Sequence, residues 1–195
     1  MIGASDGKFV LPLAEAGYDV IAIENDPLAL CGGEVLLPVS GFAYAPGLVE
    51  RLKEADLQQR VRIVAEDFLD TEVDGLVSDA VWTSCSWHYS VNHRRPLSEF
   101  VTRMQQLVQP GGLCGAEFMM PSDDRHDEIE HYTTPNALAS HFGDAWTTLL
   151  VLQTAPFLER AHVGQMHDHT HRMGMLMATK HPDGYTKGGP SHDEA

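Results

Sequence analysis

Apolar segments of strand length alternate with amphipathic segments of helical period along most of the chain. The predicted strands are nearly continuous apolar runs, as expected where both faces of a sheet are covered. They lie at 18–24, 60–70, within 75–90, and at 113–121. The predicted helices have apolar residues three and four positions apart, and they lie at 9–16, 45–59, 96–112 and 134–143. Alternation of this kind predicts an α/β fold with a Rossmann-like, doubly wound and mostly parallel sheet.

The pattern changes near the C-terminus, where two apolar segments follow one another without an intervening helix. These segments, 146–159 and 171–180, predict an antiparallel C-terminal strand in the sheet. Residues 27–37 predict a helix that begins at Pro27 and is interrupted by two glycines. We expect a single domain over 1–182, followed by a disordered polar tail over 183–195.

The composition argues against some classes of binding partner. The 195 residues carry a formal net charge of −15, and a surface this acidic repels phosphate backbones and anionic lipid. No run of eighteen apolar residues occurs, so no transmembrane helix is expected. Three widely spaced cysteines favour a reducing compartment. We therefore expect a cytoplasmic protein with a small-molecule substrate and with neither a nucleic-acid nor a membrane partner. The oligomeric state stays open, with a homodimer as one alternative.

The first ten residues, MIGASDGKFV, carry small residues at alternate positions: Gly3, Ser5 and Gly7. Such a loop, placed before a helix, lets a ligand approach the backbone and the helix N-terminus. The next predicted strand ends at Glu24, which is 24 − 3 = 21 positions after Gly3. In dinucleotide-binding folds this spacing sets a carboxylate against the ribose hydroxyls of the ligand.

Four stretches together resemble class I S-adenosylmethionine-dependent methyltransferases. They are IGASDGKFVLPLAEAGYDVIAIENDP, AEDFLD, LVQPGGLCGAEF, and the C-terminal stretch from HYTTPNALASHFGDAWTTLLVLQ through HRMGMLMATKHP, which is similar to the tellurite-resistance-type branch. The resemblance covers about residues 1–182. It implies the class I methyltransferase fold and S-adenosyl-L-methionine as cofactor. It also implies cofactor-binding roles for Gly3, Ala4, Ser5, Gly7, Glu24, Asn25, Asp67, Phe68, Ser84 and Cys85.

The sequence departs from the family pattern in two places. Ser5 stands where the family has the middle glycine of its loop, and only Met1 and Ile2 precede that loop. A central strand normally has about five residues. We therefore expect the natural start to lie upstream of Met1, with a truncated protein as the alternative.

The segment after the fourth predicted strand, SCSWHYS, lies where a doubly wound sheet binds its ligands. We expect His88 to act as a general base, because a histidine titrates near neutral pH, with a packing or surface role as the alternative. His131 is the second candidate for a catalytic role. Trp87, Tyr89, Tyr132 and His162 are the expected substrate-pocket residues. Cys85 is not favoured as a nucleophile, because no partner base is evident.

Alternating histidines at 167, 169 and 171 would share one face of a strand. Three imidazoles can bind zinc, but a strand rising about 3.3 Å per residue separates alternate positions by roughly 7 Å. On that spacing we expect a surface hairpin and no metal.

The function favoured by the sequence is in-line methyl transfer to an O, N or S nucleophile of a small molecule. Two alternatives stay open: an oxyanion-detoxifying, tellurite-type methyltransferase, and a non-catalytic protein with the methyltransferase fold. A nicotinamide oxidoreductase is disfavoured because Asp6 makes the loop acidic. A nucleic-acid or protein methyltransferase is disfavoured by the net charge and by the absence of an Asn-Pro-Pro-Tyr-like motif after the fourth strand. The sequence does not identify the methyl acceptor.

Overall fold

The computed structural model describes residues 1–195 except 90–93, 123–125, 127, 164 and 184–195, and it leaves the side chains of His88 and Tyr89 undescribed. The expected disordered tail, from 184 onward, lies outside the described residues. No helix in the described ranges is long and apolar enough to cross a bilayer.

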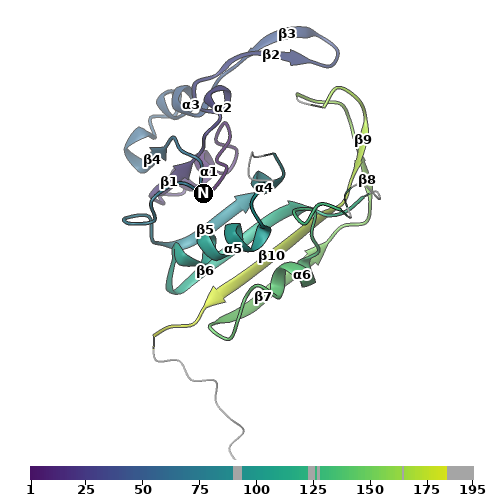
Figure 1. The fold of residues 1–195 in the computed structure, drawn as a ribbon. Helices are drawn as coiled ribbons and strands as arrows, with labels where there is room; N and C mark the ends of the chain where they lie inside the picture. The colour runs from purple at the N-terminus through teal and green to yellow at the C-terminus, as the bar shows by residue number, and fades with distance from the viewer. Residues whose placement is uncertain (90–93, 123–125, 127, 164, 184–195) are drawn as a thin grey trace, which may run out of the picture.

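The sheet consists of two parts (Figure 1). Ile2 forms parallel bridges to Ile23 in one part and to Thr83 in the other. The smaller part is a parallel pair, β1 (Val20–Ile23) and β4 (Val61–Val64). The larger part has the order β5 (Ser78–Ser84), β6 (Val108–Met119), β10 (Met173–Lys180) and β7 (Trp146–Gln153).

Strand β5 pairs with β6 in parallel, whereas β10 runs antiparallel to both β6 and β7. The expected antiparallel C-terminal strand is therefore confirmed. The α/β class is also confirmed, but the sheet is fragmented rather than one continuous Rossmann sheet.

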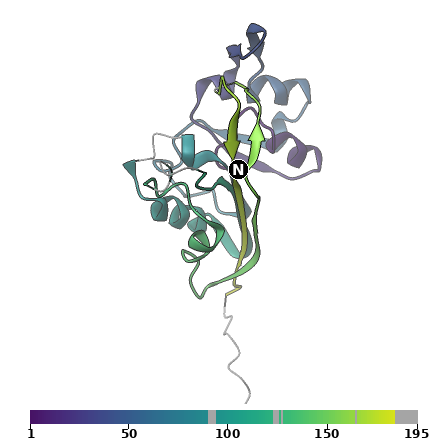
Figure 2. The same cartoon turned by 90° about the vertical axis from the view of Figure 1, so that its right-hand side faces the viewer.

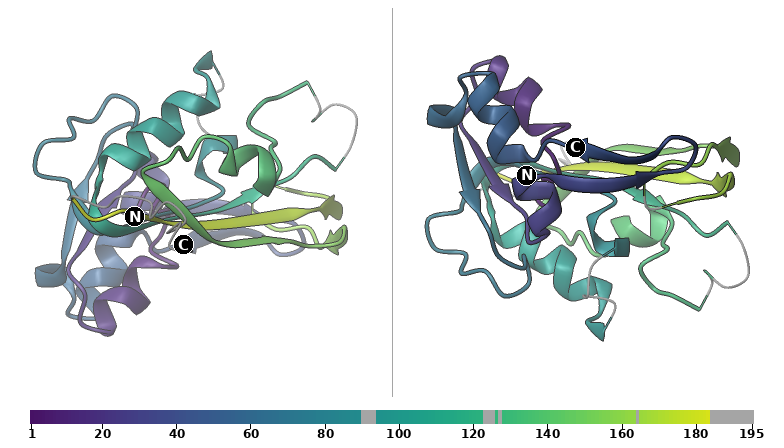
Figure 3. Two further views of the ribbon diagram at one scale, coloured as in Figure 1. Left: turned by 90° about the horizontal axis from the view of Figure 1, so that it is seen from below. Right: turned by 90° about the horizontal axis from the view of Figure 1, so that it is seen from above.

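Helices cover both faces of the sheet (Figure 3). On one face, α1 (Val10–Glu15), α2 (Pro27–Cys31) and α3 (Leu48–Glu54) pack their apolar residues on β1 and β4. On the other face, α5 (Leu97–Gln106) and α6 (Pro135–Ala139) pack on the larger part of the sheet. Two short elements, η1 (Gln58–Arg60) and α4 (Ser86–Tyr89), precede β4 and follow β5. Burial of α5 follows its three- and four-residue spacing: Leu97, Phe100, Val101 and Met104 are all within 2% exposure.

Two hairpins lie outside the sheet. Where an interrupted helix was predicted, the chain forms α2 and then a hairpin of β2 (Gly33–Leu37) and β3 (Gly41–Ala45). The helix ends there because Gly32 takes a positive φ of 76°, and Gly33 already pairs with Ala45. The second hairpin, β8 (Phe157–Glu159) and β9 (His169–His171), continues from the ends of β7 and β10 (Figure 2). The single strand predicted over 146–159 is thus two strands, interrupted at 154–156.

Candidate functional site

The glycine-rich loop has an unusual backbone at each of its three small residues. Gly3, Ser5 and Gly7 have φ angles of 62°, 51° and 97°, in or near the left-handed region that favours glycine. A Cβ at Gly3 would lie 2.3 Å from Cβ of Ser86, so the loop packs directly on the start of α4. A Cβ at Gly7 would lie 2.7 Å from Cδ1 of Leu48 in α3. Close packing and positive φ both account for glycine at these two positions.

Glu24 holds this loop from the end of β1. Its Oε2 accepts a hydrogen bond from the Ser5 N–H at 2.7 Å. Its Oε1 accepts hydrogen bonds from the N–H groups of Asn25 and Asp26, each at 2.9 Å. These three bonds fix the orientation of the carboxylate before any ligand arrives. Oε1 accepts two of them, and Oε2 accepts one.

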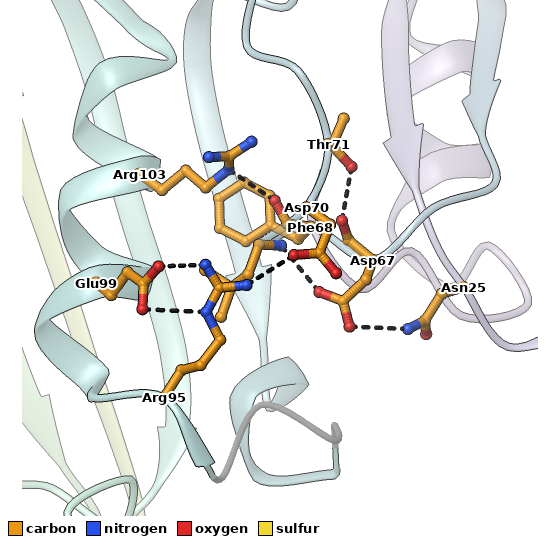
Figure 4. Close-up of polar contacts among 9 residues, drawn as sticks. Asn25, Asp67, Phe68, Asp70, Thr71, Arg95, Glu99 and Arg103 are labelled. Carbon is orange, nitrogen blue, oxygen red and sulfur yellow. Dashed lines mark hydrogen bonds and ion pairs between the residues drawn. The ribbon is translucent and has the colours of Figure 1, made fainter.

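The turn after β4 presents Asp67 and Phe68, with Asp67 beside Asn25 (Figure 4). Asp67 Oδ1 accepts the Leu69 N–H at 2.9 Å, and Oδ2 accepts the side-chain amide of Asn25 at 3.3 Å. Phe68 is 6% exposed, and its ring packs edge-on against Phe100 of α5 at a centroid distance of 4.7 Å. Hydrogen bonds and aromatic packing thus fix this turn at the carboxyl end of β4.

Two arginines connect α5 and the residues before it to the same turn (Figure 4). Arg103 Nε donates to the Phe68 carbonyl at 2.8 Å, and its guanidinium lies 5.9 Å from the centre of the Phe68 ring. Arg95 Nη1 donates to Asp70 at 2.8 Å and also pairs with Glu99. The hydrogen bond from Arg95 holds the pKa of the Glu99 carboxyl below its usual range.

At the end of β5, Ser84 and Cys85 turn toward Glu117 of β6. Ser84 Oγ donates to Glu117 Oε2 at 2.7 Å, and the Cys85 N–H donates to the Glu117 carbonyl at 2.8 Å. Cys85 has a positive φ of 53°. Burial, together with the Glu117 carboxylate, raises the pKa of the Cys85 thiol to about 12. The thiol is therefore protonated near neutral pH.

These segments surround one cleft of about 680 Å³, a volume typical of small-molecule sites. The cleft lies outside the carboxyl ends of β1, β4 and β5, where an α/β sheet binds its ligands. Four carboxylates line it, from Glu24, Asp26, Glu66 and Asp67. The turn between β8 and β9 closes another side, with His162, Val163 and Gln165.

Most of the residues expected to bind a cofactor line this cleft: Gly3, Ser5, Glu24, Asn25, Asp67, Phe68, Ser84 and Cys85. Ala4 and Gly7 lie behind it. Ala4 is 2% exposed and donates its N–H to Ile23, and Gly7 donates its N–H to the Ala4 carbonyl. These two residues shape the loop from the side of the protein core.

Among the residues expected to bind substrate or to act in catalysis, some lie at the cleft and others do not. His162 lines the cleft. The structure places Trp87 in the hydrophobic core instead, at 1% exposure between Phe100 and Phe118, because its ring is apolar and its Nε1–H bonds to the His131 carbonyl at 2.9 Å. His131 is 5% exposed and is not among the cleft-lining residues, and Tyr132 stacks on His126 at 3.9 Å. The side chains of His88 and Tyr89 lie outside the described part of the chain.

The sequence did not predict several residues of the cleft. Asp26 and Glu66 are adjacent to predicted residues at strand ends, and that adjacency was the available signal. Val163 and Gln165 come from a turn more than sixty residues beyond the cleft's other segments, and no motif marks them.

The spacing argument against a metal site does not hold for the folded hairpin. The rings of His169 and His171 are only 4.5 Å apart, because the side chains lean toward one another. A cluster of metal-ligating groups forms here, and it contains His162 and Glu159 but not His167.

No protein-family model matches the sequence, and no curated protein matches it either. Solved structures do match in fold, at low identity. TehB from Haemophilus influenzae matches with a TM-score of 0.64 and 14% identity, over 92% of this chain and 56% of TehB. The N-methyltransferase NodS from Bradyrhizobium japonicum, solved with S-adenosyl-L-homocysteine, matches with a TM-score of 0.60 and 13% identity, over 92% and 75% of the two chains. The [4+2]-cyclase SpnF matches with a TM-score of 0.63 and 11% identity, over 93% and 73%.

Methyltransferases such as NodS are among the structural neighbours, and this chain has their fold. At these identities the likeness establishes the fold and leaves the activity to the site itself.

Proposed function

We propose that this protein binds S-adenosyl-L-methionine in the cleft and transfers its methyl group to a small molecule. The observation that carries the proposal is the convergence of the left-handed loop, Glu24, Asp67 and the end of β5 on one cleft. NodS, a structural neighbour, was solved with the product of this cofactor.

The donor groups suit the cofactor. Glu24 Oε2 accepts one hydrogen bond among the described residues and retains lone pairs for a ribose hydroxyl. Phe68 offers an apolar wall for the adenine, and Gly3 allows the loop to pack closely on Ser86 where both line the cleft. Four carboxylates around the cleft favour a cationic sulfonium and an ammonium over the phosphates of a dinucleotide.

S-adenosyl-L-methionine would supply an activated methyl group on a positively charged sulfur. The contribution of the chain is then to align the acceptor and exclude water. We keep His88 as the candidate base for acceptors that carry a proton, because it lies two positions after Ser86, the last of three consecutive residues of the cleft wall. His131 is a weaker candidate, since it is buried away from the residues that line the cleft.

Calorimetry with S-adenosyl-L-homocysteine tests the cofactor site. Glu24→Gln should weaken binding by about 10- to 150-fold, the equivalent of a hydrogen bond to a charged group. Glu72→Gln, an exposed residue outside the cleft, is the matched control and should bind as the parent does. Circular dichroism of both variants separates loss of the site from loss of the fold. Absence of binding to the parent protein would overturn the proposal.

Turnover distinguishes an enzyme from a non-catalytic protein of the same fold. The cyclase among the structural neighbours shows that the fold does not guarantee methyl transfer. Release of S-adenosyl-L-homocysteine should be followed with amine, hydroxyl and thiol acceptors, and with tellurite for the oxyanion alternative. The carboxylates of the cleft disfavour an oxyanion acceptor. Cofactor binding without turnover on any acceptor would favour the non-catalytic alternative.

A further inference from the structure

Four side chains with metal-ligating atoms converge on the β8–β9 hairpin. They are Glu159, His162, His169 and His171, and one ligand atom from each lies within 4.8 Å of all the others. His171 Nε2 lies 2.9 Å from Glu159 Oε2, and His169 Nε2 lies 3.8 Å from the same oxygen. His162 Nε2 lies 3.8 Å from Glu159 Oε1. Ligand atoms around a tetrahedral zinc ion are about 3.3 Å apart, given bond lengths of roughly 2.0 Å.

Strand pairing explains why these residues meet. Glu159 is directly opposite His169 in the hairpin, and Phe157 is opposite His171. Residues two apart on a strand share a face, so Glu159, His169 and His171 lie on one face of the hairpin. The chain then turns back at His162, which pairs with Gln165 and brings a third imidazole to that face.

The tautomers of two histidines are set by backbone carbonyls. His169 Nδ1 lies 2.8 Å from the His167 carbonyl, and His162 Nδ1 lies 2.8 Å from the Val163 carbonyl. A carbonyl only accepts, so each Nδ1 carries the proton and each Nε2 presents a lone pair to the cluster. Metal-ligating histidines are usually oriented in this way.

One of these lone pairs has no other role among the described residues. His169 Nε2 is buried and has no hydrogen-bond partner there. A buried polar atom without a partner is costly, and it is rare in folded proteins. A bound cation would satisfy this atom together with the other three ligands.

We propose that Glu159, His162, His169 and His171 form a binding site for one divalent transition-metal ion, with Zn²⁺ as the ion that fits best. Three imidazoles and one carboxylate are ligands that zinc prefers in a tetrahedral site. The set leaves out His167, so it differs from the three alternating histidines that the sequence presents.

The proposed ion would link the two arms of the hairpin. Glu159 and His162 come from the first arm, and His169 and His171 come from the second. Because His162 also lines the cleft, the ion would hold His162 and the neighbouring Val163 in place as a cleft wall. Four protein ligands fill a tetrahedral shell, so this role is structural rather than the activation of water.

Zinc binding to the tag-free protein of 195 residues tests the site without any methyl-transfer assay. Protein stripped with a chelator should bind one Zn²⁺ in competition with a chromophoric chelator. His169→Gln and Glu159→Gln should each weaken binding by at least about 10²-fold, since even changes in outer-shell partners cost metal sites 10–100-fold. His167→Gln is the matched control, because it keeps the carbonyl that orients His169 and should bind as tightly as the parent.

A second measurement does not depend on how well the variants fold. Arg160 lies exposed in the first arm of the hairpin. Zn²⁺ should slow trypsin cleavage after Arg160 in the parent protein, and a chelator should restore it. Failure of the stripped parent to bind one Zn²⁺, or equal affinity in the parent and the His169→Gln variant, would overturn the proposal. Because neither measurement uses the cofactor, a negative result here leaves the methyltransferase proposal standing.

Discussion

Three residues of the 3–7 loop share a positive φ, and only Ser5 among them has a side chain. A residue with a Cβ in the left-handed region costs about 1–2 kcal/mol relative to the right-handed one. The Ser5 side chain is exposed, and its N–H bonds to Glu24, so the conformation is imposed by the loop rather than by side-chain packing. Serine thus occupies a position whose backbone geometry favours glycine.

Ser5→Gly should therefore raise the free energy of unfolding by about 0.5 kcal/mol. The relief of strain exceeds the entropy that glycine adds to the unfolded chain, which is roughly 0.5–1 kcal/mol. Ser40→Gly, at an exposed turn position outside the positive-φ set, is the control and should lower stability by about that entropic amount. Denaturant unfolding of both variants measures the difference, and a loss of stability in Ser5→Gly would contradict the strain argument.

The two cysteines at 31 and 85 should differ sharply in reactivity toward iodoacetamide. Cys31 is exposed, whereas burial raises the pKa of Cys85 to about 12. Because the thiolate is the reactive form, Cys85 at pH 8 should react about 10³-fold more slowly than an ordinary thiol. Its rate should keep rising with pH up to the region of its pKa. Mass spectrometry of the alkylated peptides measures both rates, and unfolding in guanidinium should make them similar. Comparable rates in the folded protein would refute the raised pKa.

At the scale of elements, helix α5 holds in place the turn of Asp67 and Phe68, which belongs to the cleft wall. Its apolar face packs on the sheet, while Arg103 on its flank bonds to the Phe68 carbonyl. Arg95, just before the helix, adds ion pairs to Asp70 and Glu99. The turn that carries Asp67 and Phe68 thus depends on a helix about thirty residues further along the chain.

Arg103→Ala should weaken binding of S-adenosyl-L-homocysteine by about 5- to 15-fold, because one hydrogen bond of roughly 1–1.5 kcal/mol no longer holds the turn. Arg62→Ala, which removes a comparable bond to the Gly75 carbonyl away from the cleft, is the matched control. Calorimetry on both variants measures the effect. Equal affinities would mean that the turn keeps its position without α5.

At the scale of the whole molecule, Ile2 connects the two parts of the sheet. Its N–H donates to the Trp82 carbonyl at 2.9 Å, and its carbonyl accepts the Thr83 hydroxyl at 3.1 Å. The neighbouring Met1 carbonyl and Ala4 N–H bond to Ile23 in β1. The side chain of Ile2 is 1% exposed and belongs to the larger hydrophobic core.

Ile2→Ala should lower the free energy of unfolding by about 2–5 kcal/mol, the usual range when a buried isoleucine is truncated to alanine. Val39→Ala, at 98% exposure, should change it by less than about 0.5 kcal/mol. Thermal and denaturant unfolding of the two variants give the comparison. A small effect of Ile2→Ala would show that the junction between the two parts of the sheet tolerates a cavity.

The sequence by itself determined the α/β alternation, the antiparallel C-terminal strand and the residues on one half of the cleft. These features depend on local periodicity and on short spacings along the chain, such as that between Gly3 and Glu24. Both can be read without knowledge of the tertiary contacts. Even the positions at Asp67 and Ser84 followed from their places at strand ends, because parallel strands deliver their carboxyl ends to one edge of a sheet.

Only the tertiary structure decided the features that depend on contacts between distant segments. Trp87 packs in the core because Phe100 and Phe118 surround it, which no pattern near residue 87 indicates. Residues 33–45 form a hairpin because cross-strand pairing there prevails over helical propensity. The grouping of His162 with His169 and His171 depends on hairpin register and on a turn. Spacing along the chain fixes how far apart Cα atoms lie on one strand, whereas side-chain direction and strand pairing decide which ligand atoms meet.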